Sequence, residues 1–281
     1  MNFKYKNIFF VYFLLGIFSL AFGKTISLSP AEIKQIGDQV FVNECAGKDE
    51  CLMEWSEGED FLSLGLGHFI WYPKDKTGPF EESFPVFVNY LKEKLVKLPD
   101  FLDKDPFPDC PWTSREDFLK NKQGVKAQEL YHFLIETKGW QSVFLIAHLK
   151  VSLALMLHHV PEKNRVALRK QFNRVASTLQ GTYVLADYAN FKGLGISSSE
   201  RYQGNGWGLL QVLSRMKGDK GGLKAINEFV QVADKVLTDR VNNAPADRQE
   251  QRWLLGWQNR IKSYLEKWQT GGITEAVKNS G

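Results

Sequence analysis

The chain has 281 residues, of which 43% are hydrophobic and 24% are charged, and its formal net charge is +4 at neutral pH. These values describe an ordinary soluble globular protein. The charge is too small to indicate nucleic acid as a partner. The chain has no internal repeats and no low-complexity tracts that would suggest a repeat protein or a linker.

The first element is an apolar run over residues 8–22, which follows two lysines. Ala21 and Gly23 place small residues at the two positions that a signal peptidase reads. The run is shorter than a membrane-spanning helix, and no cysteine follows it to carry a lipid. The sequence predicts a signal peptide over residues 1–23 and one domain over residues 24–281, forming a secreted or periplasmic monomer without membrane attachment after cleavage.

A strong helix start follows the predicted signal. Ser29 is an N-cap serine, Pro30 occupies the first helical position, and Glu32 stands three residues after the cap, which is a capping box. Apolar residues then recur at helical spacing and define one stripe, formed by Ile33, Ile36 and Val40. The sequence predicts a helix that ends near Ala46.

Glu44 falls on this apolar stripe, one turn after Val40. A carboxyl group at the edge of a core is poorly solvated, so its pKa rises and its proton stays available near neutral pH. Such a residue can act as a general acid. In the alternative interpretation the helix end is frayed and Glu44 turns to solvent.

Three cysteines lie in the predicted mature chain, Cys45, Cys51 and Cys110. In an oxidising compartment we expect one disulfide and one remaining thiol, and the sequence does not indicate which pair forms. A metal site is the weaker alternative, because His68 is the one histidine near these cysteines. We expect neither a metal nor an organic cofactor.

Residues 52–55 and 61–72 are rich in aromatic and apolar residues, and a polar, glycine-centred turn separates them. They predict a β-hairpin. Alternation along the second strand would place Glu59, Ser63 and the two glycines that follow on one face. Those glycines would leave the face open to another chain.

The run Ser63-Leu64-Gly65-Leu66-Gly67-His68, preceded by Glu44 at a helix end, resembles the start of the phage-type lysozymes, within the lysozyme-like superfamily. In that family a glutamate is followed by a hairpin aspartate and by Thr-Ile-Gly-Tyr-Gly-His. The resemblance covers residues 29–73. It implies a mostly α (α+β) fold, in which a helical lobe and a small β-hairpin lobe form a saccharide cleft.

The resemblance also implies site residues. Glu44 would be the general acid, and Ser63 would replace the family's threonine, which helps to position water or substrate. No aspartate stands at the family's offset, and Glu54, Glu57, Glu59 and Asp60 all lie in the interval. Glu59 shares a strand face with Ser63, so it is chosen as the second catalytic carboxylate; the alternative is a solvated turn residue. His68 is a candidate substrate-binding residue, and we expect it to order the hairpin rather than to react.

Helices are predicted next over residues 80–98, opened by Pro85, and over residues 140–160, which are apolar nearly all round, as in a central buried helix. A proline-rich loop separates them. Two amphipathic helices, over residues 223–241 and 248–268, end the chain.

A second polar and aromatic cluster covers residues 187–193 and 200–211. Its glycines neither follow a strand nor have dinucleotide spacing, so a nucleotide site is rejected. Rings that stack on sugars and amides that bind hydroxyls are the better interpretation, with a buried core as the alternative. The candidate saccharide-binding residues are Tyr188, Asn190, Tyr202 and Trp207.

Two further resemblances lie in this cluster. Asn190-Phe191-Lys192-Gly193 is similar to a Phe-Asn-x-Gly stretch of phage-type lysozymes. Residues 208–212 are similar to the Gly-Leu-Met-Gln-Ile of lytic transglycosylases, in which a catalytic glutamate lies upstream. Glu200 is therefore a rival acid, although Ser197 and Glu200 also match a capping box that needs no chemistry.

The sequence thus predicts a secreted glycoside hydrolase of the lysozyme or muramidase type, which cleaves β-1,4 bonds in peptidoglycan. The acidic turn before Ser63 suggests the N-deacetylated form as a substrate. The first alternative is a lytic transglycosylase that gives anhydro products. The others are a non-catalytic cell-wall-binding protein and a lysozyme-fold inhibitor or assembly factor.

Overall fold

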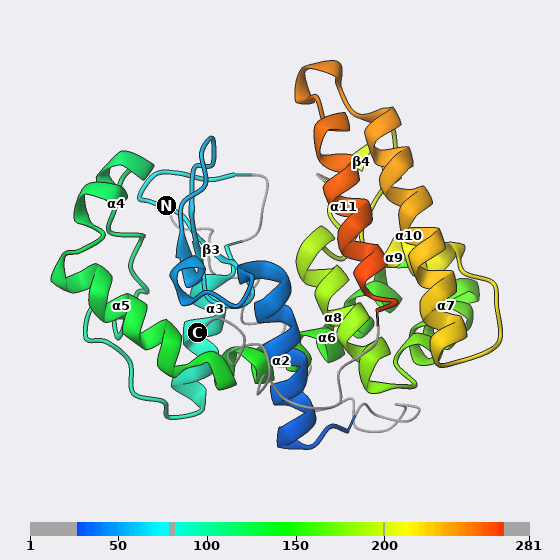
Figure 1. Ribbon diagram of the computed structural model, residues 1–281, viewed down its shortest axis with the longest axis horizontal. Coiled ribbons are helices and arrows are strands. Elements are labelled where there is room, and N and C mark those ends of the chain that lie inside the picture. Colours follow the sequence, from blue (N-terminus) through cyan, green and yellow to red (C-terminus); the bar gives the residue numbers. More distant parts are fainter. Residues whose placement is uncertain (1–26, 79–81, 199, 267–281) are drawn as a thin grey trace, which may run out of the picture.

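The computed structural model describes residues 27–78, 82–198 and 200–266, so the predicted signal peptide lies outside the described residues. The protein is mostly helical with a small antiparallel sheet, as predicted. Figure 1 shows the sheet with α3, α4 and α5 on one side of the molecule and α7 to α11 on the other. Helices α2 and α6 lie between these two groups.

Helix α2, Pro30–Cys45, begins as predicted. The Ser29 hydroxyl accepts a hydrogen bond from the Glu32 amide at 3.3 Å, and the Glu32 carboxylate accepts one from the Ser29 amide at 2.8 Å. Ile36 and Val40 are buried. The helix ends at Ala46, which has a left-handed backbone conformation with φ of 48°.

The sheet has three strands in the order β1-β2-β3, with β1 at Met53–Glu54, β2 at Leu62–Leu64 and β3 at Phe69–Trp71. A 3₁₀ turn, Asp49–Leu52, leads into it. The prediction of one continuous strand over residues 61–72 is wrong, because the chain reverses between β2 and β3. Gly65 has φ of 69°, and the His68 amide donates to the Gly65 carbonyl at 3.1 Å.

The expected open glycine face is also absent from β2, whose three residues are all buried. A Cβ added at Gly65 would lie 2.5 Å from Gln141 Oε1. The bare backbone therefore admits a side chain of α6 rather than a saccharide. Gln141 Oε1 accepts a hydrogen bond from the Leu66 amide at 2.7 Å, which fixes this turn to α6.

The aromatic residues of β3 belong to the core. The Phe69 ring stacks on Phe87 at 4.8 Å between centroids, and Trp71 lies 5.0 Å from Phe84. Both partners come from α3, Phe84–Glu93, which is shorter than the predicted helix over residues 80–98. Helices α4, Arg115–Asn121, and α5, Val125–Glu136, complete this side of the molecule.

The predicted central helix is α6, Lys138–His159. It packs against α2, α3, α7 and α8. Its length and composition alone would suit a membrane span, but it is largely buried within the protein, as expected of a core helix. It carries the buried Gln141 that holds the β2–β3 turn.

The other group of helices contains α7, Glu162–Val175, α8, Leu179–Lys192, and α9, Leu209–Arg215. Helices α10, Leu223–Asn243, and α11, Gln251–Ser263, pack on each other and are joined through a 3₁₀ turn, Ala246–Arg248. The last predicted helix, residues 248–268, is therefore longer than α11.

A two-stranded ribbon lies between α8 and α9, formed by β4, Arg201–Tyr202, and β5, Asn205–Gly206. The Ser197 amide donates to the Glu200 carboxylate at 3.3 Å, as in a capping box. No α-helix starts there in the described part of this loop, because the chain enters β4 instead. The Ser197–Glu200 hydrogen bond, which was expected to cap a helix, therefore closes a turn.

Candidate active site around Glu44

Glu44 lies in the last turn of α2 and its side chain is 9% exposed. The helix continues through Cys45, so the alternative of a frayed end with Glu44 in solvent is wrong. Since Val40 is buried and Glu44 is one turn further along the same face, the stripe that builds the core also directs this carboxylate inward.

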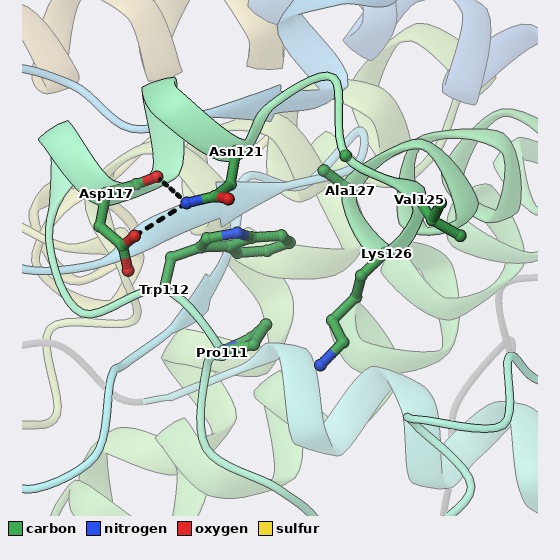
Figure 2. A pocket seen from close by; sticks show the side chains of 8 residues that line it. Pro111, Trp112, Asp117, Asn121, Val125, Lys126 and Ala127 are labelled. Carbon is green, nitrogen blue, oxygen red and sulfur yellow. Dashed lines mark hydrogen bonds between the residues drawn. The ribbon is translucent and has the colours of Figure 1, made fainter.

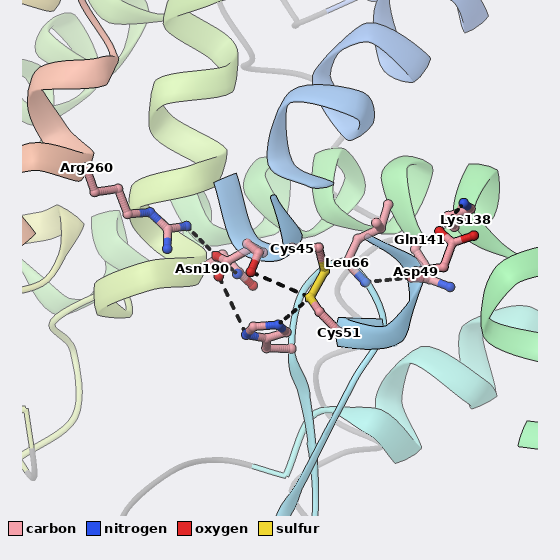
Figure 3. The surroundings of a disulfide bond; sticks show 10 residues. Cys45, Asp49, Cys51, Leu66, Lys138, Gln141, Asn190 and Arg260 are labelled. Atoms are coloured by element: carbon pink, nitrogen blue, oxygen red, sulfur yellow. Dashed lines mark hydrogen bonds and ion pairs between the residues drawn. A yellow bond between two sulfur atoms is a disulfide. The ribbon is translucent and has the colours of Figure 1, made fainter. Parts of the chain in front are cut away.

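Three side chains from three other elements surround the Glu44 carboxylate. Arg260 of α11 forms an ion pair with Oε1, and Asn190 of α8 donates to the same oxygen at 3.4 Å. His68, at the end of the β2–β3 turn, places Nδ1 3.5 Å from Oε2. Figure 3 shows Asn190 and Arg260 reaching toward the end of α2 beside Cys45. The sequence brought Glu44, His68 and Asn190 forward as candidates, and the fold brings them together.

Arg260 is held from behind by Asp187 of α8. Its Nε and one terminal nitrogen lie 3.0 and 2.9 Å from the two carboxylate oxygens of Asp187. The Tyr264 hydroxyl donates to the same carboxylate. Asp187 is fully buried, so it neutralises Arg260 and is out of reach of a ligand. Arg260 is therefore shared between one buried and one slightly exposed carboxylate.

Charge and burial act in opposite directions on Glu44. Burial raises the pKa of its carboxyl group, but the charges of Arg260 and His68 and the hydrogen bonds of Arg260 and Asn190 outweigh it and hold the pKa below the ordinary value. The expectation of a raised pKa is wrong for this arrangement, because Arg260 was not visible from the sequence around Glu44. Glu44 is ionised at neutral pH.

The disulfide joins Cys45 to Cys51 and Cys110 is a buried free thiol, which confirms the predicted count. The bond ties the residue after Glu44 to the chain that leads into the sheet. Cys51 Sγ lies 3.7 Å from His68 Nε2. The sulfur atoms and His68 are close enough to suggest a metal site, but the disulfide consumes both thiolates that such a site would need.

Ser63 and Glu59 are not in contact with Glu44 among the described residues. Ser63 is buried in β2, where it pairs with Glu54 and Ile70. Glu59 lies in the loop before β2 and lines a cavity of about 260 Å³ with Asp60, Lys76 and Arg115, among others. Burial raises the pKa of Glu59, the Ser56 hydrogen bond lowers it, and Glu54 raises it further. Glu59 thus belongs to a separate acidic cluster.

Two of the four predicted sugar-binding residues are core residues. Tyr188 is fully buried and its hydroxyl donates to the Trp207 carbonyl at 2.9 Å, while Trp207 is 6% exposed. The prediction that these rings stack on sugars is wrong, because apolar packing occupies them. Tyr202 is half-buried against Trp207 and donates to Glu250 at 2.8 Å. Asn190 alone of the four reaches Glu44.

Sequence reasoning missed Arg260 and Asp187. Asp187 opens the polar cluster on α8, and its spacing to Asn190 places both on one helix face, which could have indicated a shared partner. Arg260 offered no such signal, because basic residues are common on an amphipathic helix near the end of a chain. Only tertiary packing pairs it with Glu44.

A second cavity, of about 330 Å³, lies between the loop at Pro111 and the start of α5 (Figure 2). Trp112 and Lys126 line it together with the one carboxylate, Asp117. Asp117 accepts hydrogen bonds from Asn121 and from the Thr113 amide, both at 2.9 Å. The cavity therefore offers no acid and base pair, and Glu44 remains the candidate site.

Comparison of the chain with models of protein families, with curated proteins and with solved structures found no match. The functional argument therefore rests on the geometry of the site and on the sequence pattern that leads to it.

Proposed function

We propose that the chain is a secreted, lysozyme-like glycoside hydrolase that cleaves β-1,4 bonds in peptidoglycan, with Glu44 as its catalytic carboxylate. One observation carries the proposal: a nearly buried glutamate at a helix end faces the histidine that closes a Gly-x-Gly-His turn. The mostly helical fold with a small sheet agrees with the coarse architecture that the sequence resemblance implies.

The general-acid role requires that Glu44 gain a proton when substrate binds. Asp187 holds Arg260 through two hydrogen bonds, so Arg260 stays paired if its contact with Glu44 breaks. A saccharide that takes this place leaves Glu44 desolvated without its main counter-charge, which raises its pKa. The protonated carboxyl then donates to the leaving glycosidic oxygen.

The water-activating group of a hydrolase is proposed to be Glu59 or a neighbouring acid. The turn that carries Glu59 also holds Glu57 and Asp60, and this acidic loop would favour the cationic glucosamine of N-deacetylated peptidoglycan. Lys76 lies 3.6 Å from Asp60 and offsets part of that charge. The preference for a deacetylated wall follows from charge alone.

A lytic transglycosylase is the second candidate, and a specific observation favours it. Among the described residues no carboxylate other than the buried Asp187 lies near Glu44 in its ion-pair network. After giving its proton to the leaving oxygen, Glu44 would accept a proton from the sugar's own hydroxyl, which attacks the anomeric carbon and closes an anhydro ring. No second acid is needed in that route.

Incubation of purified protein with peptidoglycan, followed by mass spectrometry of the released muropeptides, tests the proposal. Reducing-end products support a hydrolase, and anhydro products support the transglycosylase. Glu44→Gln should release neither, while Glu129→Gln, at an exposed position of α5, should be as active as the native protein. If the native protein sediments with walls but releases nothing, it is a non-catalytic wall-binding protein and the proposal fails.

A further inference from the structure

Helix α11 carries a stripe that leads away from Glu44. Trp253, Trp257, Arg260 and Tyr264 follow one another at steps of four, three and four residues, so they share one helix face. Arg260 and Tyr264 belong to the Glu44 network. The two tryptophans continue the stripe outward, with ring centroids 6.2 Å apart, and Trp253 is 42% exposed.

Lys192, at the end of α8, lies against this stripe. Its ammonium group is 3.4 Å from the Trp257 ring centroid and 4.0 Å from that of Phe191. The Arg260 guanidinium packs on the same Phe191 ring at 4.2 Å. Lys192 is therefore next to the Glu44 network, on the side from which the tryptophans extend.

Lys192 forms no ion pair within the described residues. The residue is 8% exposed, and no carboxylate or hydrogen-bond acceptor within the described residues pairs with its ammonium group. Its cationic neighbours are compensated, since Glu250 binds Arg240 at 2.7 Å and Asp187 and Glu44 bind Arg260. Burial, followed by repulsion from Arg240 and Arg260, lowers the pKa of Lys192, and the charge of Glu250 opposes this shift only in part. Two rings offset only part of the cost of burying such a group.

We propose that Trp253, Trp257 and Lys192 form a binding subsite for a carboxylate-bearing saccharide. A pyranose ring stacks on the exposed Trp253 indole, beside the partly buried Trp257, and a carboxylate on the sugar pairs with the Lys192 ammonium. An anion at this place forms the direct ion pair that Lys192 lacks among the described residues, in surroundings where a paired carboxylate is held strongly.

This subsite specifies the substrate of the proposed function. It rests on that function, because it assumes that the bound glycan runs from the tryptophans toward Glu44. A glycan whose sugars carry carboxyl groups, such as one containing muramic acid, would occupy it. A neutral β-1,4 glycan of the same length would keep the stacking and lose the ion pair. Selectivity for acidic over neutral chains therefore comes from Lys192, and affinity for both comes from the tryptophans.

Tryptophan fluorescence titration of the Glu44→Gln protein, which prevents turnover, tests this. The probes are peptide-free glycan strands containing muramic acid and chitotetraose, a neutral chain. We expect the acidic strands to bind about tenfold more tightly, and Lys192→Met to remove that difference without weakening chitotetraose binding. Trp253→Ala should weaken both ligands about equally, whereas Trp140→Ala, at an exposed position of α6, should change neither.

Equal binding of acidic strands by Lys192→Met and its parent would overturn the proposal, as would unchanged binding in Trp253→Ala. Both variants should keep the parent's circular dichroism spectrum, because Trp253 is exposed and Lys192→Met removes a buried charge that forms no ion pair within the described residues. If the native protein cleaves no wall but the Lys192 effect is present, the subsite stands and the proposed function fails. If walls are cleaved and neither variant alters binding, the subsite alone fails.

Discussion

Arg260 joins Glu44 to Asp187, so a slightly exposed carboxylate and a fully buried one share a single guanidinium. The sharing is unequal. Asp187 is held by two nitrogens of Arg260 and by the Tyr264 hydroxyl, and Glu44 by one nitrogen of Arg260. Glu44 is thus the partner that can be released.

Replacing Glu44 by Gln should lower wall-clearing activity at least about hundredfold, because general acid catalysis contributes on that order. Folding should be little affected, since Arg260 keeps Asp187 as its partner. Turbidity of a cell-wall suspension and the Tm together check this. A Glu44→Gln protein with full activity would show that the catalytic carboxylate lies elsewhere.

Arg260→Gln should destabilise the protein by about 3–5 kcal/mol, because it leaves Asp187 buried without a counter-charge. Urea unfolding measures the loss. The double variant Arg260→Gln with Asp187→Asn removes the orphaned charge and should recover much of the stability. If the double variant is no more stable than the single one, the Asp187 pair does not explain the effect.

The same Arg260→Gln change should raise the pKa of Glu44, since burial remains while the main opposing charge is lost. If Glu44 acts as a proton donor, the alkaline limb of the kcat/KM profile should move to higher pH. An unshifted profile would mean that Glu44 is not the titrating group of the free enzyme.

Glu44 should make the stability of the folded protein depend on pH in the acidic range. Its folded-state pKa lies below the ordinary value of 4.5, so its contribution is complete above that value and is lost as the pH falls through the folded pKa. Thermal unfolding from pH 6 to pH 3 should therefore show a larger loss in the native protein than in Glu44→Gln. Parallel curves for the two proteins would contradict the low pKa.

Gly65→Ala should destabilise the β2–β3 turn by about 1–3 kcal/mol, because the position combines a left-handed backbone with a Cβ 2.5 Å from Gln141 Oε1. Gly58→Ala is the matched control, since Gly58 has φ of 82° but open space around it. The difference between the two unfolding free energies isolates the contact with Gln141. Equal losses of stability in the two variants would show that the contact with Gln141 does not contribute.

Cys110 should resist alkylation in the folded protein. Burial, opposed by a backbone hydrogen bond from Trp112, raises its pKa to about 12, so almost no thiolate is present at pH 8. Iodoacetamide labelling followed by intact mass should show no adduct until urea is added. Cys45 and Cys51 should label only after reduction, and labelling of the untreated folded protein would contradict the pairing.

Local patterns predicted local structure well. The capping box at Ser29 and the helical spacing before Glu44 fixed where α2 starts and which face it buries. The apolar composition of residues 140–160 indicated α6 for the same reason: the pattern that predicts a helix lies within the residues that form it. Strand alternation failed after Leu64, because a glycine that reverses the chain and a glycine that opens a strand face are alike in sequence.

The candidate site could be predicted only in part. Glu44 and His68 were identified through motifs, but the sign of the pKa shift at Glu44 depends on Arg260, 216 positions later. Tyr188 and Trp207 are aromatic, as sugar-binding residues often are, but both are buried in the core. The sequence does not distinguish the two cases, since aromatic rings occur in both. Pairing between distant elements is a property of the packed chain.

The wide separation of Glu44 and Arg260 along the chain also bears on when the protein can work. A chain emerging from a ribosome or a translocation channel completes α2 and the sheet long before α11 exists. Until α11 docks, Glu44 lacks the guanidinium that governs its charge, and Asp187 lacks the counter-ion that lets it be buried. If Glu44 is the catalytic carboxylate, as proposed, the newly made chain is inactive until α11 docks and completes the Glu44 network.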